Sequence, residues 1–285
     1  MGYGHRVAST KRLFKALTRR GPQRVLRGDL AFAGLPGIVY TPESGLNLPG
    51  VALGHDWLAT ADRYRGTLEH LASWGIVAAA PNTETSVAPS VMNLAFDLGT
   101  ALDIITGVRL GPGKISVHPT KLAVAGHGFG GAAAVFAAAG MPVKPKAAVA
   151  LFPTVTKPRA EQPAASLKVP GLVLTAPGDP VTLRSNAVEL ARAWRTSTLR
   201  TVDVKAGGLI EGRRLARVVG LPGADRDSQK VVRALLTGYL LYMLTGDKEY
   251  REFADPDALL PKTRPADPNA NPVDLEDKVV ALLKP

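Results

Sequence analysis

Residues 121–139 read KLAVAGHGFGGAAAVFAAA, and this stretch decides the fold. It opens with a short apolar run that has the composition of a buried strand. It ends with a run of small residues that suits a helix, and glycines stand between the two at positions 126, 128, 130 and 131. Glycines at this spacing allow a strand and a helix to pack closely across a sharp turn. We expect Gly128 to occupy that turn in a backbone conformation unfavourable to other residues.

Apolar runs and helical patterns alternate on both sides of this stretch. Residues 30–32 and 37–40 are expected to form an opening antiparallel hairpin, followed by buried strands at 51–53, 76–80, 122–125, 147–152, 172–175 and 199–204. Helical patterns cover residues 61–73, 91–108, 131–139, 183–194 and 227–245. This order predicts an α/β fold with a mostly parallel central sheet, an antiparallel N-terminal hairpin and helices on both faces.

Composition limits the chemistry that the chain can carry. With 285 residues, 46% of them hydrophobic, the chain is long enough to bury one large core. It has no cysteine, which excludes disulfides, thiolate-bound metals and a cysteine nucleophile. The net charge is +11, but eight basic residues lie in the first 28, and the remainder carries 27 basic against 24 acidic residues. The nearly balanced body gives no reason to expect nucleic-acid binding.

We divide the chain into a basic amphipathic arm (1–28), an α/β domain (29–246) and a proline-rich strap with a short last helix (247–285). On a helix, Leu13, Phe14 and Leu17 of the arm form one apolar stripe among basic residues. Such a stripe binds an anionic membrane surface or packs on its own domain. No secretory signal pattern is present, so we expect a cytoplasmic protein, with peripheral binding at the inner face of the membrane as an open alternative.

The run Gly126-His127-Gly128-Phe129-Gly130-Gly131 resembles the G-x-S-x-G nucleophile elbow of the α/β-hydrolase superfamily. It is most similar to the dienelactone-hydrolase and polyester-hydrolase (cutinase-like) esterases, over roughly residues 30 to 245. The resemblance implies a nucleophilic serine at the position of Gly128, a catalytic acid at Asp179 and a histidine base near Gly208.

Two of these three catalytic groups are missing. Glycine at position 128 has no side chain with which to form an acyl-enzyme. The histidines are His5, His55, His70, His118 and His127, and none follows the elbow. Position 208, where the base is expected, is a glycine. The resemblance therefore implies a degenerate site in which the acid Asp179 alone remains.

A binding corner is expected to persist without the nucleophile. Gly54-His55-Asp56-Trp57 resembles the loop that helps to form an oxyanion hole, so its backbone and the N–H of Phe129 are candidates to hold a small carboxylate, phosphate or acyl ligand. We expect His55, Asp56, Trp57, His127 and Phe129 to be the ligand-binding residues.

A metal held by His55, Asp56 and His127 is the alternative to simple packing of these side chains. Gly126, Gly128 and Gly131 also match the dinucleotide pattern, but the first acid after them is Glu161, too far along for a ribose contact. We therefore expect neither a metal nor a cofactor.

The favoured hypothesis is an esterase-like pseudoenzyme that binds a ligand or a partner. The alternatives are an ester hydrolase that acts by a non-serine route and a membrane-surface adaptor that uses the arm. The sequence does not indicate an oligomeric state.

Overall fold

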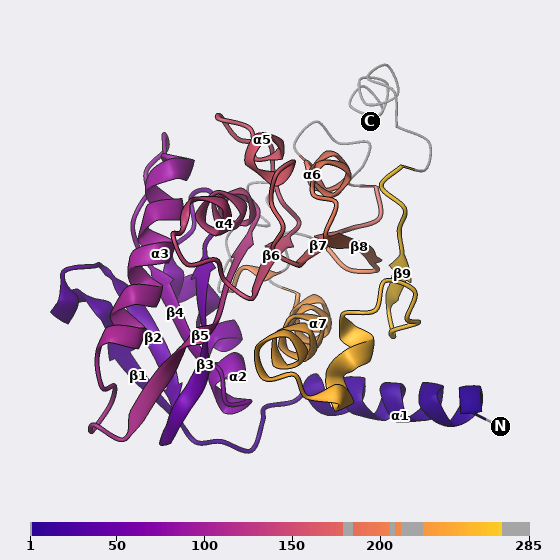
Figure 1. Cartoon of the computed structure of the whole chain (residues 1–285), viewed down its shortest axis with the longest axis horizontal. Coiled ribbons are helices and arrows are strands. Elements are labelled where there is room, and N and C mark those ends of the chain that lie inside the picture. Colours follow the sequence, from indigo (N-terminus) through magenta and orange to yellow (C-terminus); the bar gives the residue numbers. More distant parts are fainter. Residues whose placement is uncertain (1, 179–184, 206–208, 212–224, 270–285) are drawn as a thin grey trace.

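The structure, a computed structural model, describes residues 2–178, 185–205, 209–211 and 225–269. Within these ranges the chain forms one sheet with helices on both of its faces (Figure 1). The strands are β1 (Val25–Asp29), β2 (Gly37–Pro42), β3 (Gly45–Gly54), β4 (Val77–Pro81), β5 (Ile115–His127), β6 (Ala147–Leu151), β7 (Gly171–Thr175), β8 (Ser197–Val202) and β9 (Thr263–Pro265). The α-helices are α1 (Gly2–Leu17), α2 (Arg65–Ser73), α3 (Val91–Gly107), α4 (Phe129–Gly140), α5 (Glu161–Ala164), α6 (Ala187–Ala193) and α7 (Arg226–Thr245). Short 3₁₀ helices are η1 (Leu30–Ala33), η2 (Ala61–Tyr64) and η6 (Lys248–Phe253).

The strands follow the order β1-β2-β4-β3-β5-β6-β7-β8-β9 across the sheet. The run from β4 to β8 is parallel, whereas β1, β2 and β9 pair antiparallel at the two edges. This confirms the predicted mixed α/β sheet with an antiparallel N-terminal hairpin. In such a sheet the carboxyl ends of the central strands share one edge, which is where ligands bind in open α/β folds.

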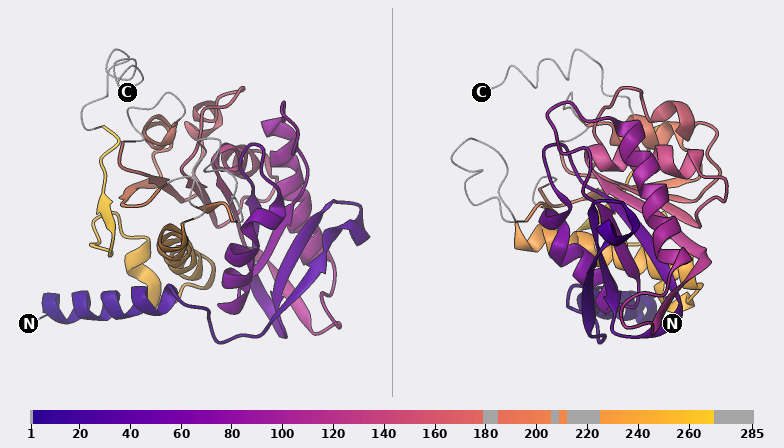
Figure 2. Two further views of the ribbon diagram at one scale, coloured as in Figure 1. Left: turned by 180° about the vertical axis from the view of Figure 1, so that it is seen from behind. Right: turned by 90° about the vertical axis from the view of Figure 1, so that its left-hand side faces the viewer.

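Helices lie on both faces of the sheet (Figure 2), and the buried side chains form two clusters, one on each face. Side chains alternate between the faces along each central strand. In β3, Val51 and Leu53 join the layer under α1, α2 and α7, whereas Ala52 joins the layer under α3, α4 and α6. Burial on both faces explains why these strands read as continuous apolar runs.

The opening hairpin differs from the prediction in its first strand. The sequence predicted a strand at 30–32, but these residues form η1, and the strand that pairs with β2 is β1, over Val25–Asp29. The Asp29 side chain caps η1 by accepting the Ala31 N–H at 2.9 Å, and Gly34 ends it with a left-handed backbone. Local capping therefore prevails over the apolar character of residues 30–32.

The arm packs against the body over its described side chains. Phe14 and Leu17 are buried in the core beside α7, and the Phe14 ring stacks on Phe253 of η6 with centroids 6.3 Å apart. The apolar stripe expected on the arm is thus covered by the protein itself. No helix in the described ranges combines the length and the apolarity that crossing a bilayer needs.

The strap contributes to the sheet, which its prolines did not indicate. Residues 263–265 form β9 at the edge beside β8, a position where a proline costs no ladder hydrogen bond. The fully buried Arg200 of β8 donates to the carbonyl oxygens of Asp255 and of Ala258, the latter at 2.9 Å. The short helix predicted near the C-terminus lies outside the described residues.

His70 of α2 is buried beside Leu17, the last residue of α1. Burial, together with the charge of Arg233, lowers the pKa of His70 from its ordinary value of 6.5 to about 4, although a hydrogen bond with the Leu17 backbone acts in the opposite direction. The native state therefore keeps a neutral imidazole in a pH range where the unfolded chain binds a proton.

We predict that this histidine makes the protein less stable in mild acid. Full stability is present above pH 6.5, and about 3 kcal/mol is lost as the pH falls to about 4, because the unfolded state alone gains the proton. Urea unfolding of wild type and His70→Leu at both pH values measures this loss as the difference between their pH dependences. His118→Leu, at a half-buried histidine near the start of β5, is the control and should behave as wild type. Equal pH dependence in wild type and His70→Leu would contradict the assignment.

Candidate functional site

The turn between β5 and α4 has the geometry that the glycine spacing predicted. Gly128 lies between the two elements with φ 54° and ψ −116°, a region that side chains with a Cβ rarely adopt. Its N–H donates to the carbonyl of Leu151 in β6 at 2.9 Å, and its own carbonyl accepts the Gly131 N–H at 3.0 Å. The elbow therefore stands at the carboxyl edge of the sheet with its backbone held on both sides.

Close backbone contacts explain the neighbouring glycines. A Cβ at Gly126 would lie 1.9 Å from the carbonyl oxygen of Gly130, and a Cβ at Gly130 would lie 2.3 Å from that of Gly54. The first turn of α4 thus packs directly on the backbones of β5 and β3. This packing accounts for the glycine pattern without a nucleotide.

The carboxylate of Asp56 fills the place of the missing side chain at the elbow. A Cβ built on Gly128 would lie 2.0 Å from Asp56 Oδ1 and 2.9 Å from Oδ2. Oδ1 accepts the backbone N–H of Phe129 at 2.9 Å and that of Trp57 at 2.8 Å. The N–H of Phe129 is one of the donors expected to hold a ligand anion, and Trp57 belongs to the loop after β3 whose backbone was expected to supply the other. The chain supplies that anion itself.

A tight turn presents Asp56 to the elbow. The Ala59 N–H donates to the Asp56 carbonyl at 3.1 Å, and Leu58 adopts a positive φ of 53°. The Asp56 N–H donates to the hydroxyl of Tyr64, which also lies 2.8 Å from Nδ1 of His127. Sequence reasoning missed Tyr64, because nothing in the helical pattern of residues 61–73 marks one tyrosine as a partner of the elbow.

The two histidines of the site are buried and brace the backbone. His55 is 1% exposed, and its Nδ1 and Nε2 lie 2.9 Å from the Asp56 carbonyl and 2.7 Å from the Thr83 carbonyl. The buried His127 ring packs edge-on against Tyr64 and Phe152. Within the ranges that the structure describes, no three histidine or carboxylate side chains gather to hold a metal. The observed contacts are those of packing residues.

Comparison with known proteins identifies the family to which the sequence belongs. The sequence model of the dienelactone hydrolase family matches residues 35–204, which is more than half of the chain and runs from β2 through the elbow and past the end of β8. This chain belongs to the dienelactone hydrolase family. A search of curated proteins found no match.

The structure describes some, but not all, of the other site residues expected from the sequence. Trp57 is 47% exposed, and its indole N–H donates to the Val87 carbonyl at 3.1 Å. Phe129 is partly buried against the core layer of α3 and α4. Asp179 and Gly208, the expected acid and the position of the lost base, lie outside the described residues. His118 lies near the start of β5, at the opposite end of the strand from the elbow.

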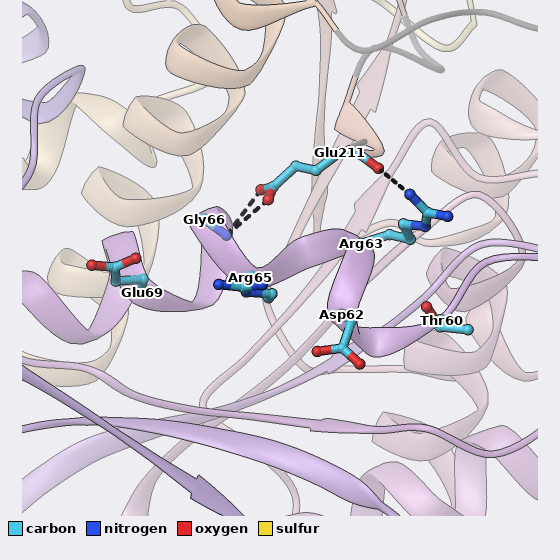
Figure 3. A pocket seen from close by; sticks show the side chains of 7 residues that line it. All are labelled: Thr60, Asp62, Arg63, Arg65, Gly66, Glu69 and Glu211. Carbon is cyan, nitrogen blue, oxygen red and sulfur yellow. Dashed lines mark hydrogen bonds between the residues drawn. The ribbon is translucent and has the colours of Figure 1, made fainter. Parts of the chain in front are cut away.

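A separate cavity of about 600 Å³ lies along η2 and the first turn of α2 (Figure 3). Polar and charged side chains of residues 60–69 line it together with Glu211. The Glu211 carboxylate accepts the Gly66 N–H at 2.9 Å and pairs with Arg233 at 2.6 Å. Its charge is thus already compensated, and the cavity shares no lining residue with the elbow.

We predict that any side chain at the elbow destabilises this member of the dienelactone hydrolase family. Gly128→Ala should cost about 1–3 kcal/mol through the strained backbone, and more because the new Cβ overlaps Asp56. Gly75→Ala is the matched control, since Gly75 also has a positive φ, of 90°, but open space at its Cβ position.

Urea unfolding of both variants and of Gly128→Ala with Asp56→Gly separates the two costs. The double variant should recover the part of the lost unfolding free energy that is due to overlap with the Asp56 carboxylate. If Gly128→Ala costs no more than Gly75→Ala, the overlap with Asp56 does not exist in solution.

Proposed function

We propose that this chain is a non-catalytic member of the dienelactone hydrolase family that binds a ligand or a partner at its elbow. The observation that carries the proposal is the Asp56 carboxylate, which lies over Gly128 and accepts both N–H groups of the corner. In a serine hydrolase the same two donors stay free for the oxyanion that forms during the reaction. Here they already have an acceptor in the resting protein.

The missing groups support the same conclusion. An acyl-enzyme needs a nucleophilic atom at the elbow, and glycine has none. A base in the family position would be a histidine after the elbow, yet the chain has no histidine beyond His127. Asp179 alone cannot replace a base and a nucleophile that are both absent.

Hydrolysis by a non-serine route is the alternative within the same fold. It would use a water molecule activated by Asp179 or by His55, Asp56 and His127. The contacts of the histidines weigh against it, because both ring nitrogens of His55 face carbonyl oxygens and Nδ1 of His127 faces the Tyr64 hydroxyl. We therefore place this route second.

A membrane-surface role for the arm is a separate proposal. Phe14 and Leu17 are buried in the core, whereas Lys11, Arg12 and Lys15 are exposed. Binding of the described part of the arm to anionic lipid would thus rest on charge without an apolar stripe, which makes it weak and sensitive to salt. A cytoplasmic location remains our proposal.

We predict that Gly128→Ser does not restore esterase activity. A serine there must displace Asp56 and also lacks a base, and general-base assistance alone is worth about 10²- to 10⁴-fold. Wild type and Gly128→Ser should both fail to turn over p-nitrophenyl esters and to react with a fluorophosphonate probe. The esterase activity of the double variant Gly128→Ser with Gly208→His should exceed the sum of the activities of the two single variants, because catalytic groups act as a unit.

Two results would count against the proposal. Turnover by wild type that survives a chelator would favour the non-serine hydrolase. Turnover by Gly128→Ser as fast as that of the double variant would show that a base is already in place.

A further inference from the structure

One oxygen of Asp56 remains open at the elbow. Oδ1 accepts two backbone N–H groups, whereas Oδ2 has no hydrogen-bond or ion-pair partner in the part of the chain that the structure describes. An ionised carboxylate has room for about four hydrogen bonds, so half of this capacity is unused. The residue as a whole is partly exposed to solvent.

The open oxygen lies where a ligand of the elbow makes its contact. Oδ2 is 2.9 Å from the Cβ position of residue 128, beside the place that a nucleophilic side chain takes in a serine hydrolase. The carboxylate cannot swing freely, because Oδ1 is held by the N–H groups of Phe129 and Trp57. A fixed negative charge thus faces anything that approaches Gly128.

The negative charge of Asp56 determines whether a cationic or an anionic ligand binds here. A carboxylate or phosphate would have to displace Oδ1 from its two donors or lie against a like charge. A protonated amine instead donates to the open oxygen, in a charge-assisted hydrogen bond.

The residues near Asp56 in the chain indicate the chemistry of the uncharged part of the ligand. Trp57 and Leu58 are each 47% exposed and Val87 is 77% exposed, and the indole N–H of Trp57 joins the two loops by its hydrogen bond to Val87. These exposed apolar side chains lie on the same loop as the carboxylate or on the loop bonded to it. Trp57 follows Asp56 directly in the chain, and the π face of an indole ring attracts an ammonium group.

We infer that the elbow binds a protonated amine carried on an apolar body. The ammonium donates to Asp56 Oδ2, and the apolar body packs on Trp57 and its exposed neighbours. This inference rests on the proposed non-catalytic function and names the ligand class of that same site.

The test uses two probes of equal shape and opposite charge, benzylammonium and benzoate, in calorimetric titrations at neutral pH. Wild type should bind benzylammonium about tenfold more tightly than benzoate, the size expected for one hydrogen bond to a charged group. Asp56→Asn keeps an acceptor for the two N–H groups but removes the charge, so it should lose that preference without gaining benzoate. Asp56→Ala frees both N–H groups and should reverse the preference toward benzoate.

Asp62→Asn is the matched control, since it removes the same charge from an exposed site that pairs with Arg27, and it should bind as wild type does. Thermal melts confirm that each variant is folded, and Asp56→Asn alone decides the matter if Asp56→Ala unfolds. Benzoate binding as tightly as benzylammonium, benzylammonium binding unchanged by Asp56→Asn, or no binding of either probe at millimolar concentration would each overturn the inference.

The outcome is separable from that of the proposed function. Ester turnover by wild type would overturn the non-catalytic role whatever the probes do. Absence of a charge preference in wild type, together with no ester turnover, would overturn the amine ligand and leave the non-catalytic role intact.

Discussion

The backbones of Gly54, Gly126 and Gly130 touch where α4 leaves the sheet, and the site depends on this contact. The contact sets the first turn of α4 directly against the carboxyl ends of β3 and β5. As a result the N–H of Phe129 comes within reach of a side chain that follows β3, more than 70 residues earlier in the chain. A methyl group at any of these glycines would move the helix away and separate the donor from Asp56.

The elbow provides an electrostatic environment that suits one negative charge. The N-terminus of α4 and the two backbone donors favour a negative charge at one point in space. In a serine hydrolase that charge develops in the transition state. Here Asp56 places its carboxylate at the same point, where the two donors also hold the loop after β3 against the elbow.

Local patterns allowed the mostly parallel sheet, the strand-to-helix turn and the conformation of Gly128 to be predicted, because the alternation of strands and helices and the glycine spacing can be read from residues close in sequence. The contact between Asp56 and the elbow could not be predicted, since it joins residues from two strands and depends on the absence of one Cβ. Asp56 was expected among the ligand-binding residues, and the structure shows it in the role of the bound group. The pairing of β9 with β8 and the capped η1 were missed because single prolines and short apolar runs do not determine strand pairing.

The overlap between a side chain at position 128 and the Asp56 carboxylate restricts which substitutions the two positions can accept during evolution. A serine introduced at 128 meets the carboxylate, and an aspartate removed first leaves two backbone donors without their acceptor. Either order passes through a less favourable intermediate, so the two positions are tied to each other. Once both residues are present, neither is easily replaced alone. Among relatives, glycine at position 128 and aspartate at position 56 should therefore vary together.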